Sequence, residues 1–134
     1  MESIFLDSSF IIALEDADDQ NHETAAASWE SFKKNPRKLI TTAYIFDETI
    51  TFLKRRISYD KAAKVGRLLL SSPLVEMAHI SEEDFKQGWA LFLNYHDKDF
   101  SFTDCVSFLV MKQQRIKKAF TFDRHFKQMG FVVV

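Results

Sequence analysis

Near its start the chain reads Ile4-Phe5-Leu6-Asp7-Ser8-Ser9, three apolar residues followed directly by an acid and two hydroxyls. An apolar run this short, bounded by polar residues, is typical of a buried strand and not of a helix. We therefore predict a strand at Ile4–Leu6, with Asp7 just past its carboxyl end and Ser8 or Ser9 capping a helix that follows.

The rest of the chain alternates between helical periodicity and short apolar runs. We expect helices at residues 8–14 and 59–70, others ending near 32, 56, 95 and 118, a short one at 124–129, and strands at 39–41, 74–78, 119–122 and 131–134. Strands separated by helices need crossover connections, which produce parallel pairing with helices on both faces of the sheet. The predicted fold is a three-layer α/β/α sandwich with a mostly parallel sheet of about five strands, formed by residues 1–134 as a single domain.

The composition favours a compact protein without a membrane-spanning segment. The 134 residues include 14 Phe but only 3 Gly and 2 Pro, which argues against disorder. The longest stretch without a charged residue covers only ten positions, 87–96, too few for a membrane span, and the first residues lack the cationic opening of a signal peptide. The single cysteine, Cys105, excludes an intramolecular disulfide, so we expect a cytoplasmic location.

The net charge of −1 is unevenly distributed. Residues 1–32 hold eight acids and no Lys or Arg, whereas the remaining residues carry all 18 basic side chains. This pattern fits a protein that binds a polyanion and also concentrates carboxylates around a metal, and it equally fits ordinary solvated helix faces.

Three acids fall where a parallel sheet places its functional crevice, beyond the carboxyl ends of the strands. Asp7 and Asp123 directly follow predicted strands, and Asp104 lies in the first turn of a predicted helix. Each acid also has an ordinary explanation as a turn or cap residue, and Asp104 completes a Ser-x-x-Asp capping box with Ser101.

Glu48 has no such explanation, because it lies in the middle of a predicted helix among apolar residues. Its neighbour Asp47 points about 100° away around the helix, so only one of the two is expected to face the strand ends. Carboxylates that converge repel one another and need a cation at neutral pH. Oxygen ligands select hard ions, so the expected cofactor is Mg²⁺, with Mn²⁺ as the substitute.

The chain resembles PIN-domain ribonucleases of the VapC toxin type. The resemblance rests on four motifs in the same order: residues 4–9, Phe46-Asp47-Glu48, residues 101–105, and residues 120–126. It implies that Asp7, Glu48, Asp104 and Asp123 are catalytic residues and metal ligands. Members often have a further acid two positions past the last one, where this chain has His125.

The resemblance implies that the chain is a Mg²⁺-dependent endoribonuclease and the toxin of a toxin-antitoxin pair. The expected partners are an RNA substrate, with structured RNA such as tRNA as a candidate, a small antitoxin that occupies the acidic groove, and a second copy in a homodimer. Hydroxyls beside the acids are candidates for orienting ligands or water, and basic residues near them for binding RNA phosphates. These are Ser8, Thr103 and Thr121, and Lys54, Arg55 and Arg124.

Two other functions fit the same pattern. One is a PIN-like module that binds RNA or protein without cleaving it. The other is a phosphoacceptor receiver domain, which also binds Mg²⁺ through acids at strand ends. A receiver has an acid pair after its first strand and a lysine after its last, whereas this chain has the single Asp7 and ends in Val132-Val133-Val134.

Overall fold

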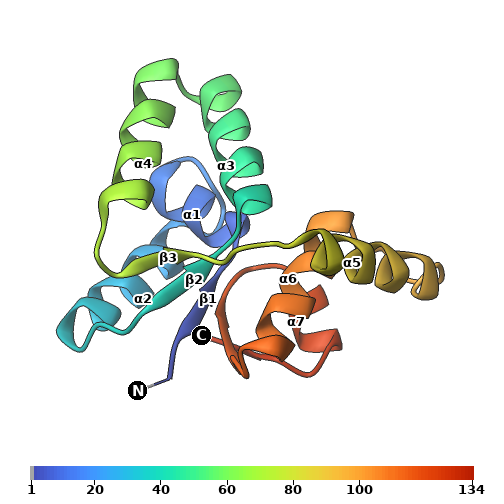
Figure 1. The fold of residues 1–134 in the computed structure, drawn as a ribbon. Helices are drawn as coiled ribbons and strands as arrows, with labels where there is room; N and C mark the ends of the chain where they lie inside the picture. The colour runs from blue at the N-terminus through green and yellow to red at the C-terminus, as the bar shows by residue number, and fades with distance from the viewer. Residues whose placement is uncertain (1) are drawn as a thin grey trace.

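The computed structural model describes residues 2–134. The elements alternate along the chain much as the sequence predicts (Figure 1). The strands are β1 (Ile4–Leu6), β2 (Leu39–Thr41), β3 (Val75–Met77), β4 (Lys118–Phe120) and β5 (Val132–Val133), and the helices are α1 (Ser8–Glu15), α2 (His22–Lys34), α3 (Ala43–Arg56), α4 (Tyr59–Ser71), α5 (Glu82–Asn94), α6 (Phe102–Gln113) and α7 (His125–Gln128).

The five strands form one sheet in the order β3-β2-β1-β4-β5, and every neighbouring pair is parallel. This confirms the predicted α/β class and strand number. It also argues against a receiver domain, because receivers of the CheY type have the order 2-1-3-4-5. The chain adds strands outward from β1 in one direction through β3, then returns to the other side of β1 for β4 and β5.

Helices cover both faces of the sheet, α1 to α4 on one side and α5 to α7 on the other (Figure 1). The alternation of side chains along β1 explains how the central strand serves both layers. Leu6 lines an apolar cavity with residues of α1, α2 and α4, whereas the ring of Phe5 lies 6.1 Å from that of Phe126 in α7. All three residues of β1 are buried, as a strand covered on both faces requires.

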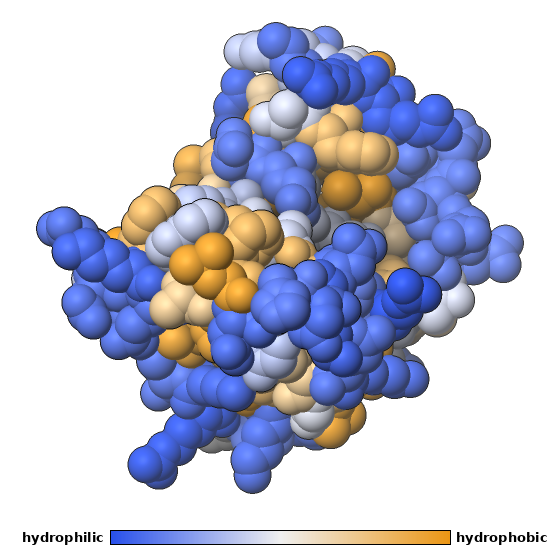
Figure 2. All heavy atoms as spheres, turned by 90° about the vertical axis from the view of Figure 1, so that its right-hand side faces the viewer, coloured by the Kyte–Doolittle hydropathy of each residue, from blue (hydrophilic) through white to orange (hydrophobic). Residues whose placement is uncertain are grey.

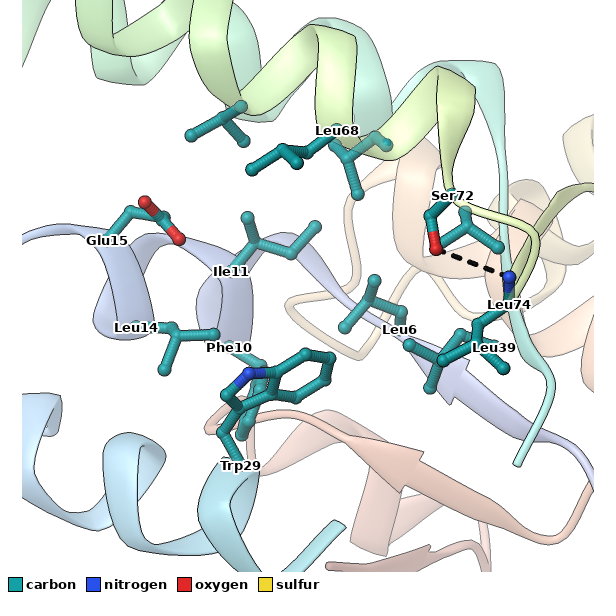
Figure 3. Close-up of a pocket in the computed structure, with 13 residues that line it drawn as sticks. Leu6, Phe10, Ile11, Leu14, Glu15, Trp29, Leu39, Leu68, Ser72 and Leu74 are labelled. Carbon is teal, nitrogen blue, oxygen red and sulfur yellow. Dashed lines mark hydrogen bonds between the residues drawn. The ribbon is translucent and has the colours of Figure 1, made fainter. Parts of the chain in front are cut away.

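The cavity beside Leu6 measures about 200 Å³ and is almost entirely apolar (Figure 3). Leu6 and Leu39 approach it from the sheet, Trp29 from α2, and Leu68 from α4. Leu68 remains more than half exposed, so the cavity opens toward the surface of α4.

The predicted end of α6 was wrong. The predicted helix reached Lys117-Lys118, but α6 ends at Gln113 and β4 begins at Lys118. The structure ends α6 with a Schellman motif: the backbone N–H of Ile116 donates to Met111 (2.8 Å) and that of Arg115 to Lys112 (3.2 Å). Arg115 adopts φ 56°, where glycine is usual, so the sequence contained no stop signal at this point.

Two local predictions also need correction. Neither Ser8 nor Ser9 caps α1, because Asp7 is the N-cap residue and both serines lie inside the first turn. The fourth strand stops at Phe120 and not at Phe122, because its partner β1 ends opposite Phe120 at Leu6. Thr121 and Phe122 are thereby left free of the ladder. The remaining boundaries differ from prediction by three residues or fewer.

Viewed from the side on which α5 and α6 lie, the surface mixes charged groups with exposed apolar ones (Figure 2). Four of the large exposed apolar side chains belong to α5: Phe85, Trp89, Phe92 and Leu93. Across residues 2–134, none of the helices has the length and apolarity needed to cross a bilayer.

The strained turn after α6 gives a stability prediction. Replacing Arg115 by glycine relieves the left-handed backbone and is expected to raise the free energy of unfolding by about 1 kcal/mol. Urea denaturation measures the change, with Arg115→Ala as the matched control that removes the side chain but keeps the strain. Equal stability of both variants would show that Arg115 carries no backbone strain.

Candidate active site

The carboxyl ends of β1 and β4 form the centre of the candidate site. These neighbouring strands flank the point at which the strand order reverses, and open α/β sheets bind ligands in the crevice at such a point. Asp7 follows β1, and Thr121 and Asp123 follow β4. The backbone N–H of Asp7 donates to the carbonyl of Phe120 at 3.1 Å, which joins the two strand ends just before they diverge.

Asp7 is buried, with 5% of its surface exposed, and two hydroxyls hold its carboxylate. Ser9 Oγ and Thr121 Oγ1 both donate to Oδ2, at 2.6 and 2.7 Å. Ser9 Oγ in turn accepts from the backbone N–H of Phe122 at 2.9 Å. Two of the hydroxyls predicted from sequence lie on acids of the site, Thr121 on Asp7 and Ser8 on Glu48, whereas Ser9 was not predicted. The position of Ser9 one residue further around α1 brings it to Asp7.

Burial raises the pKa of Asp7 from 3.8 to about 6, even though the hydrogen bonds from Ser9 and Thr121 lower it. The negative charges of Asp104 and Asp123 raise this pKa further, which shows that the three carboxylates face one region. Ionised Asp7 is therefore poorly stabilised by the protein alone.

Asp104 takes part in two arrangements at once. Its Oδ2 accepts from the backbone N–H of Ser101, while Ser101 Oγ accepts from the backbone N–H of Asp104, both at 3.0 Å. This is the capping box that the sequence predicted. Within residues 2–134, Oδ1 has no hydrogen bond, so capping leaves one oxygen available. Burial raises the pKa of this carboxyl group above its usual value, although the bond from Ser101 lowers it.

Asp123 and His125 complete a compact group with Asp104. The backbone N–H of His125 donates to Asp123 Oδ1 at 2.9 Å, a turn that brings the imidazole back over the acid. His125 Nδ1 lies 3.0 Å from Asp123 Oδ1 and 3.4 Å from Asp104 Oδ2. One potential ligand atom from each of the three residues lies within 4.8 Å of the other two. No role for His125 could be assigned from the sequence alone.

Glu48 and Asp47 point in different directions, as the helical angle between them predicts. Glu48 Oε1 accepts a short hydrogen bond from Ser8 Oγ, so its side chain turns toward the start of α1. Asp47 Oδ1 lies 3.5 Å from Thr51 Oγ1 on the exposed side of α3. Neither Glu48 nor Asp7 is a member of the group formed by Asp104, Asp123 and His125.

The other residues predicted from sequence are not members of this group. Thr103 shows no side-chain hydrogen bond among the described residues, and its carbonyl accepts from Ser107. Arg124 is exposed next to Asp123 and lines a hollow of about 240 Å³ together with Phe122 and Lys127. Lys54 and Arg55 lie in the last turn of α3, the end away from the strand edge.

The donor set suits a divalent cation. It contains three buried or half-buried carboxylates, two of them with raised pKa values, and a buried imidazole nitrogen without a hydrogen-bond partner among residues 2–134. Carboxylate oxygens favour Mg²⁺ or Mn²⁺, and a bound cation would stabilise their ionised forms. Such a site can hold a metal against an anionic substrate such as a phosphodiester.

The raised pKa of Asp7 predicts a pH-dependent stability. Between its unfolded pKa of 3.8 and its folded pKa of about 6, the native state holds more protons, so stability falls as pH rises through this range. The cost at neutral pH is about 3 kcal/mol, which Asp7→Asn removes. In EDTA, denaturation is expected to show the variant more stable than wild type at pH 7 but not at pH 3.5. Asp97→Asn, in an exposed loop, is the control; a constant difference at both pH values would contradict the prediction.

Comparisons with known proteins agree with this architecture. The sequence model of the PIN domain matches residues 4–132. The chain is 34% identical over 131 residues to the 23S rRNA-specific endonuclease VapC20 of Mycobacterium tuberculosis, covering 98% of this chain and 97% of the relative. The crystal structure of that organism's VapC20, described as a sarcin-ricin loop cleaving toxin, superposes with a TM-score of 0.88 at 32% identity and 96% coverage of both chains.

A more distant structure shares the fold alone. The Rickettsia felis VapBC2 structure, bound to a promoter DNA fragment, gives a TM-score of 0.70 at 10% identity and covers 98% of this chain and 97% of the other. The family match extends over nearly the whole sequence, from β1 to β5, and includes every acid described above. The chain therefore belongs to the PIN domain family.

Proposed function

We propose that this chain is a Mg²⁺- or Mn²⁺-dependent endoribonuclease that hydrolyses phosphodiester bonds of structured RNA. The observation that carries the proposal is the convergence of Asp7, Asp104 and Asp123 at the carboxyl ends of β1 and β4. The name of the 34% identical relative makes 23S rRNA the first substrate to test, and tRNA remains the second candidate.

Each residue of the site has a distinct task in this mechanism. Asp104, Asp123 and Asp7 would hold the ion, while Ser9 and Thr121 fix the carboxylate of Asp7 in one orientation. Glu48, held by Ser8, would bind the ion directly or through water. A bound ion would supply a water of lowered pKa and would offset charge on the scissile phosphate, so no nucleophilic side chain would be needed.

Basic residues bind the RNA backbone in this proposal. Arg124 is exposed beside Asp123 and lines the adjacent hollow with Lys127, so both are placed to contact phosphates next to the cleaved one. Lys54 and Arg55, at the far end of α3, would contact only RNA that extends well beyond the site. Thr103 is retained as a hydroxyl that orients water, since nothing in residues 2–134 occupies it.

The proposal includes protein partners and a cytoplasmic location. The relative of known structure is described as a toxin, which supports pairing of this chain with a small antitoxin. A cationic side chain of that antitoxin would compete with the metal for the carboxylates. The four exposed apolar side chains of α5 support a homodimer, because a second copy would remove them from water.

The central test is metal-dependent cleavage of purified rRNA and tRNA. Asp7→Asn and Asp104→Asn are each expected to lower the cleavage rate more than about 100-fold, because each removes the charge of a metal ligand. Ser9→Ala is expected to lower the rate about 10-fold, because it removes only one hydrogen bond that orients the Asp7 carboxylate. Rates are measured with Mg²⁺ or Mn²⁺ and with EDTA.

Asp47→Asn is the matched control for Glu48→Gln. The two acids are adjacent, yet only Glu48 is held toward α1, so Asp47→Asn is expected to keep the wild-type rate and Glu48→Gln to lose it. Identical behaviour of wild type and all acid variants, with intact fold, would reject the nuclease. RNA binding that persists without cleavage would then support the binding module.

Salt dependence tests the basic residues separately from the chemistry. Replacing Arg124 by Ala is expected to lower the magnitude of the slope of log affinity against log salt by about one, because one phosphate contact is lost. Fluorescence anisotropy with labelled RNA in EDTA measures the slope without cleavage. Lys86→Ala, on exposed α5, is the control, and an unchanged slope for Arg124→Ala would remove this residue from the RNA-binding surface.

A further inference from the structure

We infer that His125 is a metal ligand through its Nδ1, so that this site binds Mn²⁺ and similar transition-metal ions in preference to Mg²⁺. The inference rests on the metal site of the proposed function and specifies it further. It concerns which ion the site selects and by which atom.

The position of the imidazole supports ligation. Nδ1 lies 3.0 Å from an oxygen of Asp123 and 3.4 Å from an oxygen of Asp104, so one ion can contact all three residues. The side chain is largely buried, with 13% exposed, and the ring of Phe100 packs edge-on against it at 5.1 Å between centroids. The nitrogen is therefore held at the carboxylates by packing.

No protein group satisfies Nδ1. Although Asp123 Oδ1 lies close to it, Nδ1 is buried and forms no hydrogen bond with any group among residues 2–134. A buried polar atom without a partner is unfavourable and calls for an explanation. A cation between Nδ1 and the carboxylates would satisfy the nitrogen and both acids together.

The chemistry of the donors sets the preference. Mg²⁺ favours oxygen ligands and retains its waters, whereas an imidazole nitrogen suits transition metals. The other acids keep the site mainly oxygen-lined, which favours Mn²⁺ among these metals. A carboxylate at position 125 would restore an all-oxygen set.

The rival explanation makes His125 an internal cation that pairs with Asp104 and Asp123 in place of a metal. The two roles predict opposite effects of removing the side chain. Loss of a ligand weakens Mn²⁺ binding, whereas loss of a competing cation strengthens the binding of every divalent ion.

The test measures metal binding by the full chain without RNA. Isothermal titration gives the affinities for Mn²⁺ and Mg²⁺ of wild type, His125→Ala and His125→Asp, and pulsed EPR of the Mn²⁺ complex reports coupling to a ligand nitrogen. We expect nitrogen coupling in wild type and in neither of the two His125 variants. We also expect His125→Ala to weaken Mn²⁺ binding about 10-fold or more with little effect on Mg²⁺, and His125→Asp to shift the preference toward Mg²⁺.

Each alternative outcome is decisive. Stoichiometric Mn²⁺ binding without nitrogen coupling, or with equal or higher affinity in His125→Ala, overturns the inference but leaves the proposed nuclease intact. Absence of stoichiometric binding, or binding that Asp104→Asn does not weaken, overturns both. His96→Ala controls for coupling from an exposed histidine. If His125→Ala does not fold, two measurements still test the inference. These are the comparison of the wild-type spectrum with that of His96→Ala, and the Mn²⁺ to Mg²⁺ preference of His125→Asp.

Discussion

A carboxylate buried at the end of the central strand is the constraint on which the rest of this site depends. Asp7 directly follows β1, the strand with neighbours on both sides in the middle of the sheet, and water has little access to it. Its ionised form needs donors or a cation. Ser9 from the following helix and Thr121, just past the end of the neighbouring strand, supply the donors, so the two segments that flank the site are tied together by the group that they support.

Asp104 also combines two roles, because one side chain contributes both to stability and to the candidate chemistry. One oxygen fixes the start of α6 through the capping box and the other has no partner among residues 2–134. The cap orients the carboxylate before any ligand arrives, which lowers the cost of organising the site. The ordinary interpretation of this residue as a cap was therefore right and did not exclude a functional one.

The features that could be predicted from sequence are those that depend on local signals in the chain. Strand and helix order, the positions of Asp7 and Asp123 past strand ends, and the cap at Ser101 all depend on near neighbours in the chain. The contacts of Ser9 with Asp7 and of Ser8 with Glu48 depend on where α1 lies relative to β4 and α3, which neighbouring residues do not determine. The end of α6 was missed because Arg115 occupies a position where glycine is the usual signal. The approach of His125 to Asp104 requires the turn at Asp123 as well as the packing of α6, so it emerges only in three dimensions.

The strand order has a consequence for the way in which this chain is made. The central strand β1 is synthesised first, but one of its two neighbours, β4, begins only at Lys118. Until that segment leaves the ribosome, Asp7 lacks Thr121, Asp123 and His125, and one edge of β1 has no partner. A nascent chain therefore carries Asp7 through the synthesis of every residue up to Lys118 without the residues that complete the site, which forms only when the two distant segments meet.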